Sequence, residues 1–242
     1  MFLHPTQATN AALPYAIPSW PTPGAIAVQN FATTAAGLGY VTLYPPYPSD
    51  LSNSVATQKG TNLNLIANSI TGAGGTDFGT TFVDELGAWW DHMVPYCHAQ
   101  YGSVPIVVVG FSLGAWAALQ VGKNRASTVH AFGGHCIPTL FETLGFSPNP
   151  FTGLTCTNID MAPSFLNANT KPLFIGWNVN DTTVGFKDQA AGGSPPNNCQ
   201  DIASNAGGTV TTYNSVQGAP GTGHIFDAPA DATAMSNWLA TV

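Results

Sequence analysis

The feature that most constrains this chain is an apolar run that leads straight into two glycines flanking a serine. Residues 105–109 read Pro-Ile-Val-Val-Val, which is typical of a strand buried on both faces of a parallel sheet. Residues 110–114 read Gly-Phe-Ser-Leu-Gly, the G-x-S-x-G pattern in which a strand turns sharply into a helix with the serine at the apex. Residues 115–121 are strong helix formers, and Gly122 with the basic residues Lys123 and Arg125 predicts the end of that helix. The sequence therefore predicts a strand–turn–helix unit that holds Ser112 in a strained conformation, with glycines where side chains would clash.

A serine at such a turn acts as a nucleophile when an acid and then a histidine follow it along the chain. His224 is the predicted histidine, because it lies in a glycine-rich loop near the end of the chain, and loops held by a sheet often carry catalytic side chains. His135, which follows two glycines at a predicted strand end, is its one serious competitor. Other histidines fall within predicted helices or strands: His92, His98 and His130.

Asp181 is the predicted acid. Residues 171–177 form a mostly apolar stretch that we expect to be a strand, and the polar turn after it ends at Asp181. A carboxylate just past the C-terminal end of a strand points into the crevice where open α/β sheets place their sites. The alternative is that Asp181 only caps the turn. Three other aspartates lie in loop-like stretches with no strand before them: Asp160, Asp188 and Asp201.

Three segments of the chain together resemble serine hydrolases of the α/β-hydrolase superfamily. They are residues 110–114, 180–184 and 221–226. The last two are similar to the acid and histidine turns of dienelactone-hydrolase-like esterases and polyester hydrolases. The resemblance implies an α/β-hydrolase fold with a minimal, mostly parallel sheet, flanked by helices on both faces, and small loop or cap insertions. Cutinases and phage mycolyl-arabinogalactan esterases (lysin B) have such a minimal sheet.

The resemblance also implies an oxyanion hole made of two backbone N–H groups, those of Leu113 and Thr6. Leu113 follows the nucleophile, and Thr6 lies in the turn after the first predicted strand. Most relatives have a glycine where this chain has Pro5. Because proline has no N–H and could shift the turn, Gln7 is an alternative donor. The two antiparallel strands that usually open the fold are not expected, since nothing precedes the first predicted strand.

Composition limits the partners of the protein. Only 7% of the residues are charged, against about 25% in an average soluble protein. With five Lys plus Arg and a net charge of −7, the chain is not expected to bind nucleic acid or acidic lipid. No stretch approaches the roughly 20 apolar residues of a membrane span. We expect one domain over residues 1–242, a monomer that acts on an ester substrate and uses no metal or cofactor.

The same charge-poor composition suits a protein that works outside the cytoplasm on an insoluble or low-charge substrate. We therefore expect an extracellular or virion-associated protein, with a cytoplasmic location as the alternative. No signal peptide is expected, because the chain starts inside its first predicted strand.

The four cysteines fit no zinc-binding spacing. One expected disulfide joins Cys136 to Cys156, closing an irregular loop, and another joins Cys97 to Cys199. Buried free thiols are the alternative.

The remaining segments alternate between predicted strands and helices. Expected strands are residues 2–4, 40–44, 128–132 and 209–216, and expected helices are residues 24–38, 82–101 and 231–239. Residues 138–170 read as an irregular insertion that caps the site. Phe111 and Trp177 lie beside the proposed catalytic turns and are expected to line an acyl or aryl pocket, whereas Trp116 is expected in the core.

The leading functional hypothesis is a serine hydrolase that cleaves carboxylic esters through an acyl-enzyme, on apolar, aromatic or polymeric substrates. A peptidase or an acyltransferase could use the same three residues. The alternative from another class is a virion or cell-surface binding module with a vestigial hydrolase site, which the lack of charge would also suit.

Overall fold

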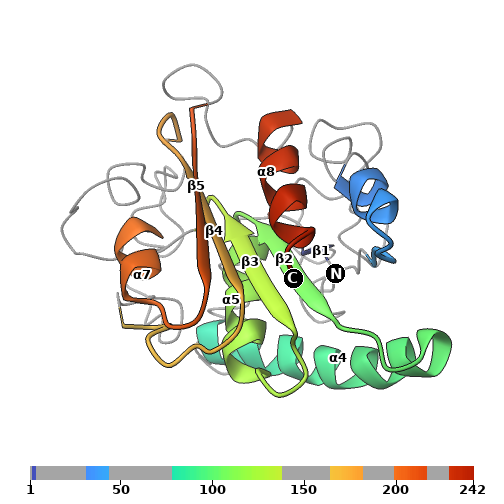
Figure 1. Cartoon of the computed structure of the whole chain (residues 1–242). Coiled ribbons are helices and arrows are strands. Elements are labelled where there is room, and N and C mark those ends of the chain that lie inside the picture. Colours follow the sequence, from blue (N-terminus) through green and yellow to red (C-terminus); the bar gives the residue numbers. More distant parts are fainter. Residues whose placement is uncertain (1, 4–30, 44–77, 138–163, 182–198, 217–228) are drawn as a thin grey trace, which may run out of the picture.

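The computed structural model describes residues 2–3, 31–43, 78–137, 164–181, 199–216 and 229–242. Within these ranges the chain forms a parallel sheet of five strands in the order β1-β2-β3-β4-β5 (Figure 1). The strands are β1 (Phe2–Leu3), β2 (Val107–Phe111), β3 (Ala131–His135), β4 (Leu173–Asn178) and β5 (Val210–Ser215). All neighbours pair in parallel, as the sequence predicts.

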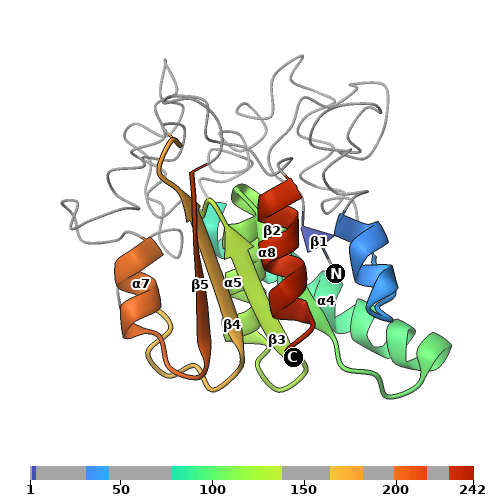
Figure 2. The same cartoon turned by 45° about the horizontal axis from the view of Figure 1, so that its top comes forward.

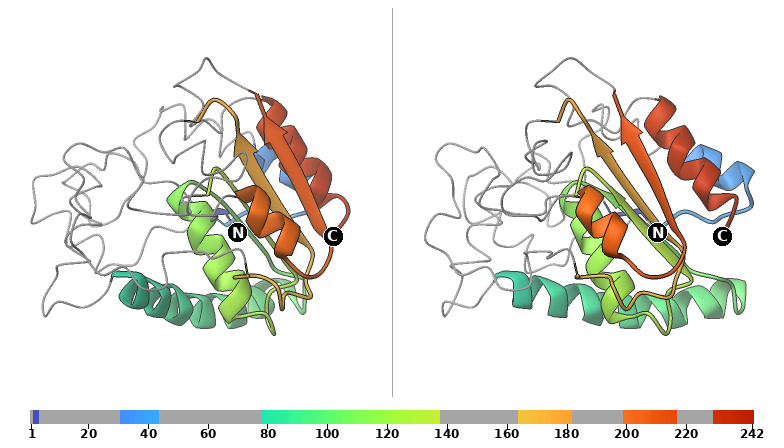
Figure 3. Two further views of the ribbon diagram at one scale, coloured as in Figure 1. Left: turned by 90° about the vertical axis from the view of Figure 1, so that its left-hand side faces the viewer. Right: turned by 60° about the vertical axis from the view of Figure 1, so that its left-hand side comes forward.

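Helices cover both faces of this sheet. They are α4 (Phe78–Tyr101), α5 (Leu113–Asn124), α7 (Cys199–Asn205) and α8 (Pro229–Leu239), and residues 31–37 are also helical. Figure 3 shows α4, α5 and α7 on one face and α8 on the other. Residues 31–37 lie on the side of α8, beyond the β1 edge. The fold class is therefore α/β, with a parallel sheet between two helical layers.

The core lies between α5 and the central strands. Every residue of β2, β3 and β4 is buried, which explains why their sequences do not alternate between apolar and polar residues. Trp116 and Leu119 of α5 are fully buried against this sheet, so the predicted core position of Trp116 is confirmed. In contrast, β5 is an edge strand in the described part of the chain, and most of its residues are at least partly exposed.

Helix α5 ends among the residues where the sequence predicts its end, but Gly122 does not end it. The helix continues through Gly122 to Asn124. A methyl group at position 122 would overlap the ring of Phe132 on β3. Gly122 is therefore required by the close approach of α5 to the sheet, and not by the end of the helix.

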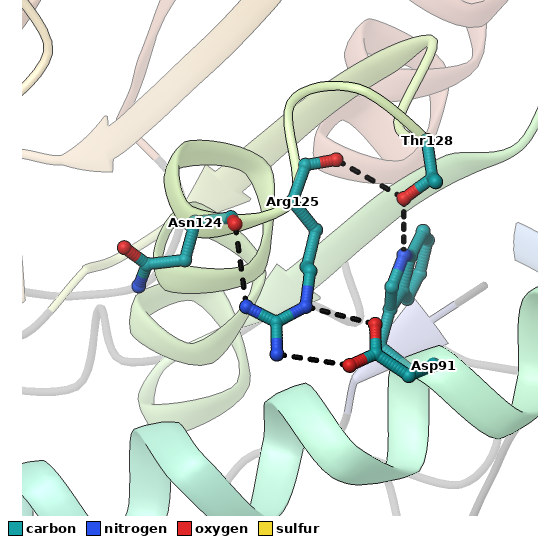
Figure 4. Close-up of polar contacts among 5 residues, drawn as sticks. Asp91, Asn124, Arg125 and Thr128 are labelled. Carbon is teal, nitrogen blue, oxygen red and sulfur yellow. Dashed lines mark hydrogen bonds and ion pairs between the residues drawn. The ribbon is translucent and has the colours of Figure 1, made fainter.

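Figure 4 shows the contacts that join α4 to the end of α5. They explain why β3 begins at Ala131 and not at the predicted residue 128. The Arg125 guanidinium donates two hydrogen bonds to Asp91, at 2.9 and 3.0 Å, and a third to the carbonyl oxygen of Asn124. The Thr128 hydroxyl accepts a hydrogen bond from the Trp90 indole at 2.8 Å and donates to the Arg125 carbonyl oxygen. The hydrogen bond from Arg125 lowers the pKa of the Asp91 carboxyl. Thr128 thus belongs to a turn. His130, which was predicted in the strand, lies just before β3 and is exposed.

The predicted strand at residues 40–44 is also wrong for its described part, because residues 40–43 are irregular. The Tyr40 hydroxyl lies 3.0 and 3.1 Å from the carbonyl oxygens of Leu239 and Val242. These contacts tie the segment to the end of α8 and not to the edge of the sheet. Helix α7 was not predicted, and Asp201 lies in its first turn and not in a loop.

No helix in the described ranges is long and apolar enough to cross a membrane. Most of the predicted insertion at residues 138–170 lies outside the described residues.

Candidate active site

Ser112 is the junction between β2, which ends at Phe111, and α5, which begins at Leu113. Its backbone has φ 56° and ψ −127°, a conformation that costs a non-glycine residue about 1–3 kcal/mol. The surrounding backbone holds it there. The Ser112 N–H donates to the His135 carbonyl oxygen at 3.0 Å, and the Ser112 carbonyl oxygen accepts from the Ala115 N–H at 2.8 Å. The predicted strained turn is confirmed.

Two glycines explain how the turn can be so tight. A side chain at Gly110 would overlap the carbonyl oxygen of Gly114, the second residue of α5. At Gly134, on the neighbouring strand, an added Cβ would lie only 2.7 Å from the Ala115 Cβ. Glycine at these positions therefore lets the first turn of α5 approach β2 and β3.

Asp181 lies three residues beyond β4, and Ser112 directly follows β2. The two strands run parallel, so their C-terminal ends lie at the same edge of the sheet (Figure 2). The Asp181 N–H donates to the Asn178 carbonyl oxygen at 3.1 Å, which closes the turn after β4. The side chain that caps this turn is Asn178, whose Oδ1 accepts from the Asn180 N–H at 2.9 Å. The Val179 N–H donates to the Ser215 carbonyl oxygen and ties the turn to β5. The Asp181 side chain is therefore not required as the cap, and it is completely buried.

A buried thiol contacts the Asp181 carboxylate. Cys136 follows β3 with a positive φ of 52°, its N–H donates to the Gly176 carbonyl oxygen, and its thiol is hydrogen-bonded to Asp181. Burial, followed by the negative charge of Asp181, raises the pKa of the Cys136 thiol well above its ordinary value. Burial also raises the pKa of the nearby Cys199 thiol, to about 12. Cys136 thus presents a proton to Asp181 at neutral pH.

The structure corrects the predicted disulfides. The cysteines of the described ranges, Cys97, Cys136 and Cys199, are buried and reduced, so neither predicted pair is formed. Cys136 is directed at Asp181 in the core. Cys97 lies on α4 near the β1 edge, whereas Cys199 begins α7, which packs on β4. Cys156, the other half of one predicted pair, lies outside the described residues.

His135, the competing histidine, is buried in the core with 1% of its surface exposed. Its ring stacks on Phe111, with the ring centroids 6.0 Å apart, and it is also 6.0 Å from the ring of Tyr213. Its Nε2 lies 3.7 Å from Oδ2 of Asp231 on α8. The sequence analysis did not identify Asp231 as a partner, because β3 and α8 are far apart in the chain.

The other predicted site residues are only partly covered by the structure. His224, Thr6 and the alternative Gln7 lie outside the described residues. Leu113 is the first residue of α5. The side chains of Phe111 and Trp177 are nearly buried, at 7% and 6% exposed, and their role as pocket lining stays a prediction.

An apolar cavity of about 350 Å³ lies away from Ser112. It is lined by the residues that lead into β2, by Tyr40 and by the chain end at Val242. Ser112 follows the opposite, C-terminal end of β2, so this cavity is not a binding pocket of the proposed nucleophile. The described residues contain no group of three side chains suited to hold a metal ion.

Comparison with known proteins places the fold. No family model and no curated protein matches the sequence. Solved structures do match. An esterase from Pyrococcus furiosus is similar over 99% of this chain and 81% of its own, with a TM-score of 0.57 and 15% identity. A sugar hydrolase from Lactococcus lactis is similar over 88% of this chain and 80% of its own, with a TM-score of 0.54 and 15% identity.

A carboxylesterase from Bacillus cereus is also similar, over 99% of this chain and 86% of its own, with a TM-score of 0.50 and 12% identity. These structures share the α/β-hydrolase fold, and this chain has that fold. At such low identity the likeness shows the fold alone, so the reaction is argued from the residues of the site.

Proposed function

We propose that this protein is a serine hydrolase that cleaves carboxylic esters through an acyl-enzyme. One observation carries the proposal: Ser112 has a positive φ at a tight junction between a buried parallel strand and a helix. A strained serine at such a junction is typical of the nucleophile of an α/β-hydrolase. The buried Asp181 carboxylate at the same edge of the sheet supports it, and esterases among the structures of similar fold are consistent with it.

In the proposed mechanism, His224 takes the hydroxyl proton of Ser112 while its Oγ attacks the ester carbonyl carbon. The tetrahedral intermediate collapses, the C–O bond of the ester breaks, and His224 gives the proton to the departing alcohol. Water, activated by His224, then attacks the acyl-enzyme and releases the carboxylic acid. Asp181 holds the imidazole in the tautomer that can accept the serine proton.

The developing oxyanion is proposed to accept hydrogen bonds from the backbone N–H groups of Leu113 and Thr6. Leu113 opens α5, so its N–H belongs to the positive end of the helix dipole. Each preorganised donor of this kind stabilises the transition state by about 3 kcal/mol.

Apolar, aromatic or polymeric esters are the proposed substrates, with Phe111 and Trp177 proposed to line the acyl or aryl pocket. Both aromatic side chains lie close to the strand ends that carry Ser112 and Asp181. The low charge of the chain supports a low-charge substrate and an extracellular or virion-associated setting. The buried thiols do not add to the case for an oxidising compartment.

The test is covalent labelling with a fluorophosphonate probe together with turnover of p-nitrophenyl esters. Wild-type protein should be labelled on Ser112 alone, and Ser112→Ala should abolish labelling and turnover. Ser103→Ala, which changes an exposed serine in the loop before β2, is the matched control and should react like wild type.

A label on another serine would remove the argument from the strained turn. A binding module with a vestigial site would give neither label nor turnover. A peptidase or an acyltransferase would be labelled at Ser112 but would prefer amide substrates or alcohol acceptors.

A further inference from the structure

Three buried polar side chains from three different elements meet behind the strained serine. His135 comes from the end of β3, Ser215 from the end of β5 and Asp231 from the first turn of α8. The Ser215 hydroxyl donates to Asp231 Oδ1 at 2.7 Å, and Asp231 Oδ2 lies 3.7 Å from His135 Nε2. All three residues are at most 1% exposed. The Asp231 carboxylate also lies at the N-terminal end of α8, where the helix dipole favours a negative charge.

The sheet is shaped to admit the imidazole of His135. A methyl group at Gly176, the register partner of His135 on β4, would overlap its Nδ1. The Phe111 and Tyr213 rings flank the imidazole from β2 and β5. Burial, with the negative charge of Asp231 as the next cause, raises the pKa of Tyr213 above its ordinary value. The imidazole therefore has a defined place, fixed by contacts from three neighbouring strands and one helix.

The same residue holds the serine through its backbone. The carbonyl oxygen of His135 accepts the hydrogen bond from the Ser112 N–H at 3.0 Å. A residue in a strained conformation persists only where its surroundings over-determine it. The side chain of His135 is held by α8, and its main chain holds the strained turn, so a continuous chain of contacts joins Asp231 to Ser112.

We propose that Asp231, Ser215 and His135 form a positioning unit that fixes the backbone of Ser112 for attack. The proposal rests on Ser112 being the nucleophile. In this proposal the three residues act on Ser112 through the His135 main chain and not on the reacting atoms. Loss of the unit should let the turn relax, which lowers the rate of the chemical step and leaves substrate binding nearly unchanged.

The experiment compares Asp231→Asn and the milder Ser215→Ala with wild type. The matched control is Ser236→Ala, because Ser236 is a buried serine of α8 whose hydroxyl donates to the Ala232 carbonyl oxygen of its own helix. Two quantities are measured: kcat and KM for a p-nitrophenyl ester, and exchange of the Ser112 amide hydrogen by NMR. We expect kcat to fall about 10- to 100-fold in Asp231→Asn, with KM changed less than about 3-fold. The Ser112 amide should exchange faster in both variants, and Ser236→Ala should match wild type.

Two results would overturn the proposal. One is a lower unfolding temperature of the variants with kcat and Ser112 amide exchange unchanged. In that case the three residues would only stabilise the fold. The other is complete loss of labelling in Asp231→Asn while His224→Ala still reacts, which would make His135 the base. If wild-type protein neither reacts with the probe nor turns over ester, the proposed function fails, whereas the exchange measurement still reports on the unit.

Discussion

Asp181 is the residue at which the proposed chemistry can be tested with least change in shape. Its carboxylate is buried and accepts a hydrogen bond from the Cys136 thiol. The amide oxygen of an asparagine can accept the same hydrogen bond. Asp181→Asn should therefore fold normally but lose on the order of 10⁴ in kcat, because the imidazole would be held in the wrong tautomer. Asp201→Asn on α7 is the control and should keep full activity. A near-wild-type rate in Asp181→Asn would show that another carboxylate orients the histidine.

The buried thiols give a second prediction at this scale. Because the pKa of Cys199 is raised to about 12 and that of Cys136 is raised well above its usual range, both lack the reactive thiolate form at neutral pH. Native protein should leave both thiols unmodified by a thiol reagent over a time in which an exposed cysteine reacts fully. Unfolding without reductant should make both reactive, which mass spectrometry of the modified peptides can follow. Failure of either to react after unfolding would mean that it is oxidised in solution.

Single residues differ in how far the sequence reveals them. Ser112 could be predicted because its turn is encoded by immediate neighbours, the two glycines and the apolar run before them. The hydrogen bond from Cys136 to Asp181 and the approach of Asp231 to His135 could not, because each joins elements that are distant in the chain. No local pattern distinguishes a cysteine that contacts a carboxylate from one that forms a disulfide.

At the scale of elements, Gly122 offers a test in which helix propensity and packing oppose each other. In a free helix, alanine is favoured over glycine by about 1 kcal/mol. At position 122, however, the methyl group would overlap the Phe132 ring. Overpacking of this kind costs about 1–3 kcal/mol, so we expect Gly122→Ala to lower the free energy of unfolding in a urea titration.

Gly37→Ala is the matched control. Gly37 ends the helical residues 31–37, and an added Cβ there meets nothing within 4 Å among the described residues. It should leave stability unchanged or raise it by up to about 1 kcal/mol. If the two substitutions had the same effect, close packing of α5 on β3 would not be the reason for glycine at position 122.

The same contact shows why element boundaries were harder to predict than element types. Glycine is common just past the end of a helix, and the sequence offers no sign that Gly122 faces the ring of Phe132 on β3. The start of β3 differs from the predicted one for a similar reason, since the Thr128 hydroxyl accepts a hydrogen bond from Trp90 of α4. Most strand and helix types could be predicted from the sequence, except the irregular residues 40–43 and helix α7. The limits of the elements depend on partners from other elements.

At the scale of the whole molecule, the order of strands and helices was enough to predict the layered sheet, because parallel strands require helical connections across the faces. Contacts between segments that are far apart in the chain could not be predicted. The clearest is Tyr40, whose hydroxyl lies near two carbonyl oxygens at the end of α8, about 200 residues later.

Tyr40→Phe should therefore lower the free energy of unfolding by about 1–2 kcal/mol, because carbonyl groups at the helix end lose a donor. Tyr96→Phe is the control, since Tyr96 lies on α4 and is 54% exposed. It should change stability little. Equal stability of the two variants would mean that water replaces the Tyr40 hydroxyl without loss.

The pH dependence of this difference tests the Tyr40 contact further. Burial raises the pKa of Tyr40 above its ordinary value of 10.0, so the folded state holds the phenol proton more tightly than the unfolded state does. The resulting stability is fully present below about pH 10 and is lost as the pH rises from there through the folded pKa. Phenylalanine has no such proton. The advantage of wild type over Tyr40→Phe should therefore be constant between about pH 7 and pH 9 and shrink above about pH 10, as measured by urea titrations across that range. An advantage that stays constant to higher pH would show that the Tyr40 hydroxyl is not held at the end of α8.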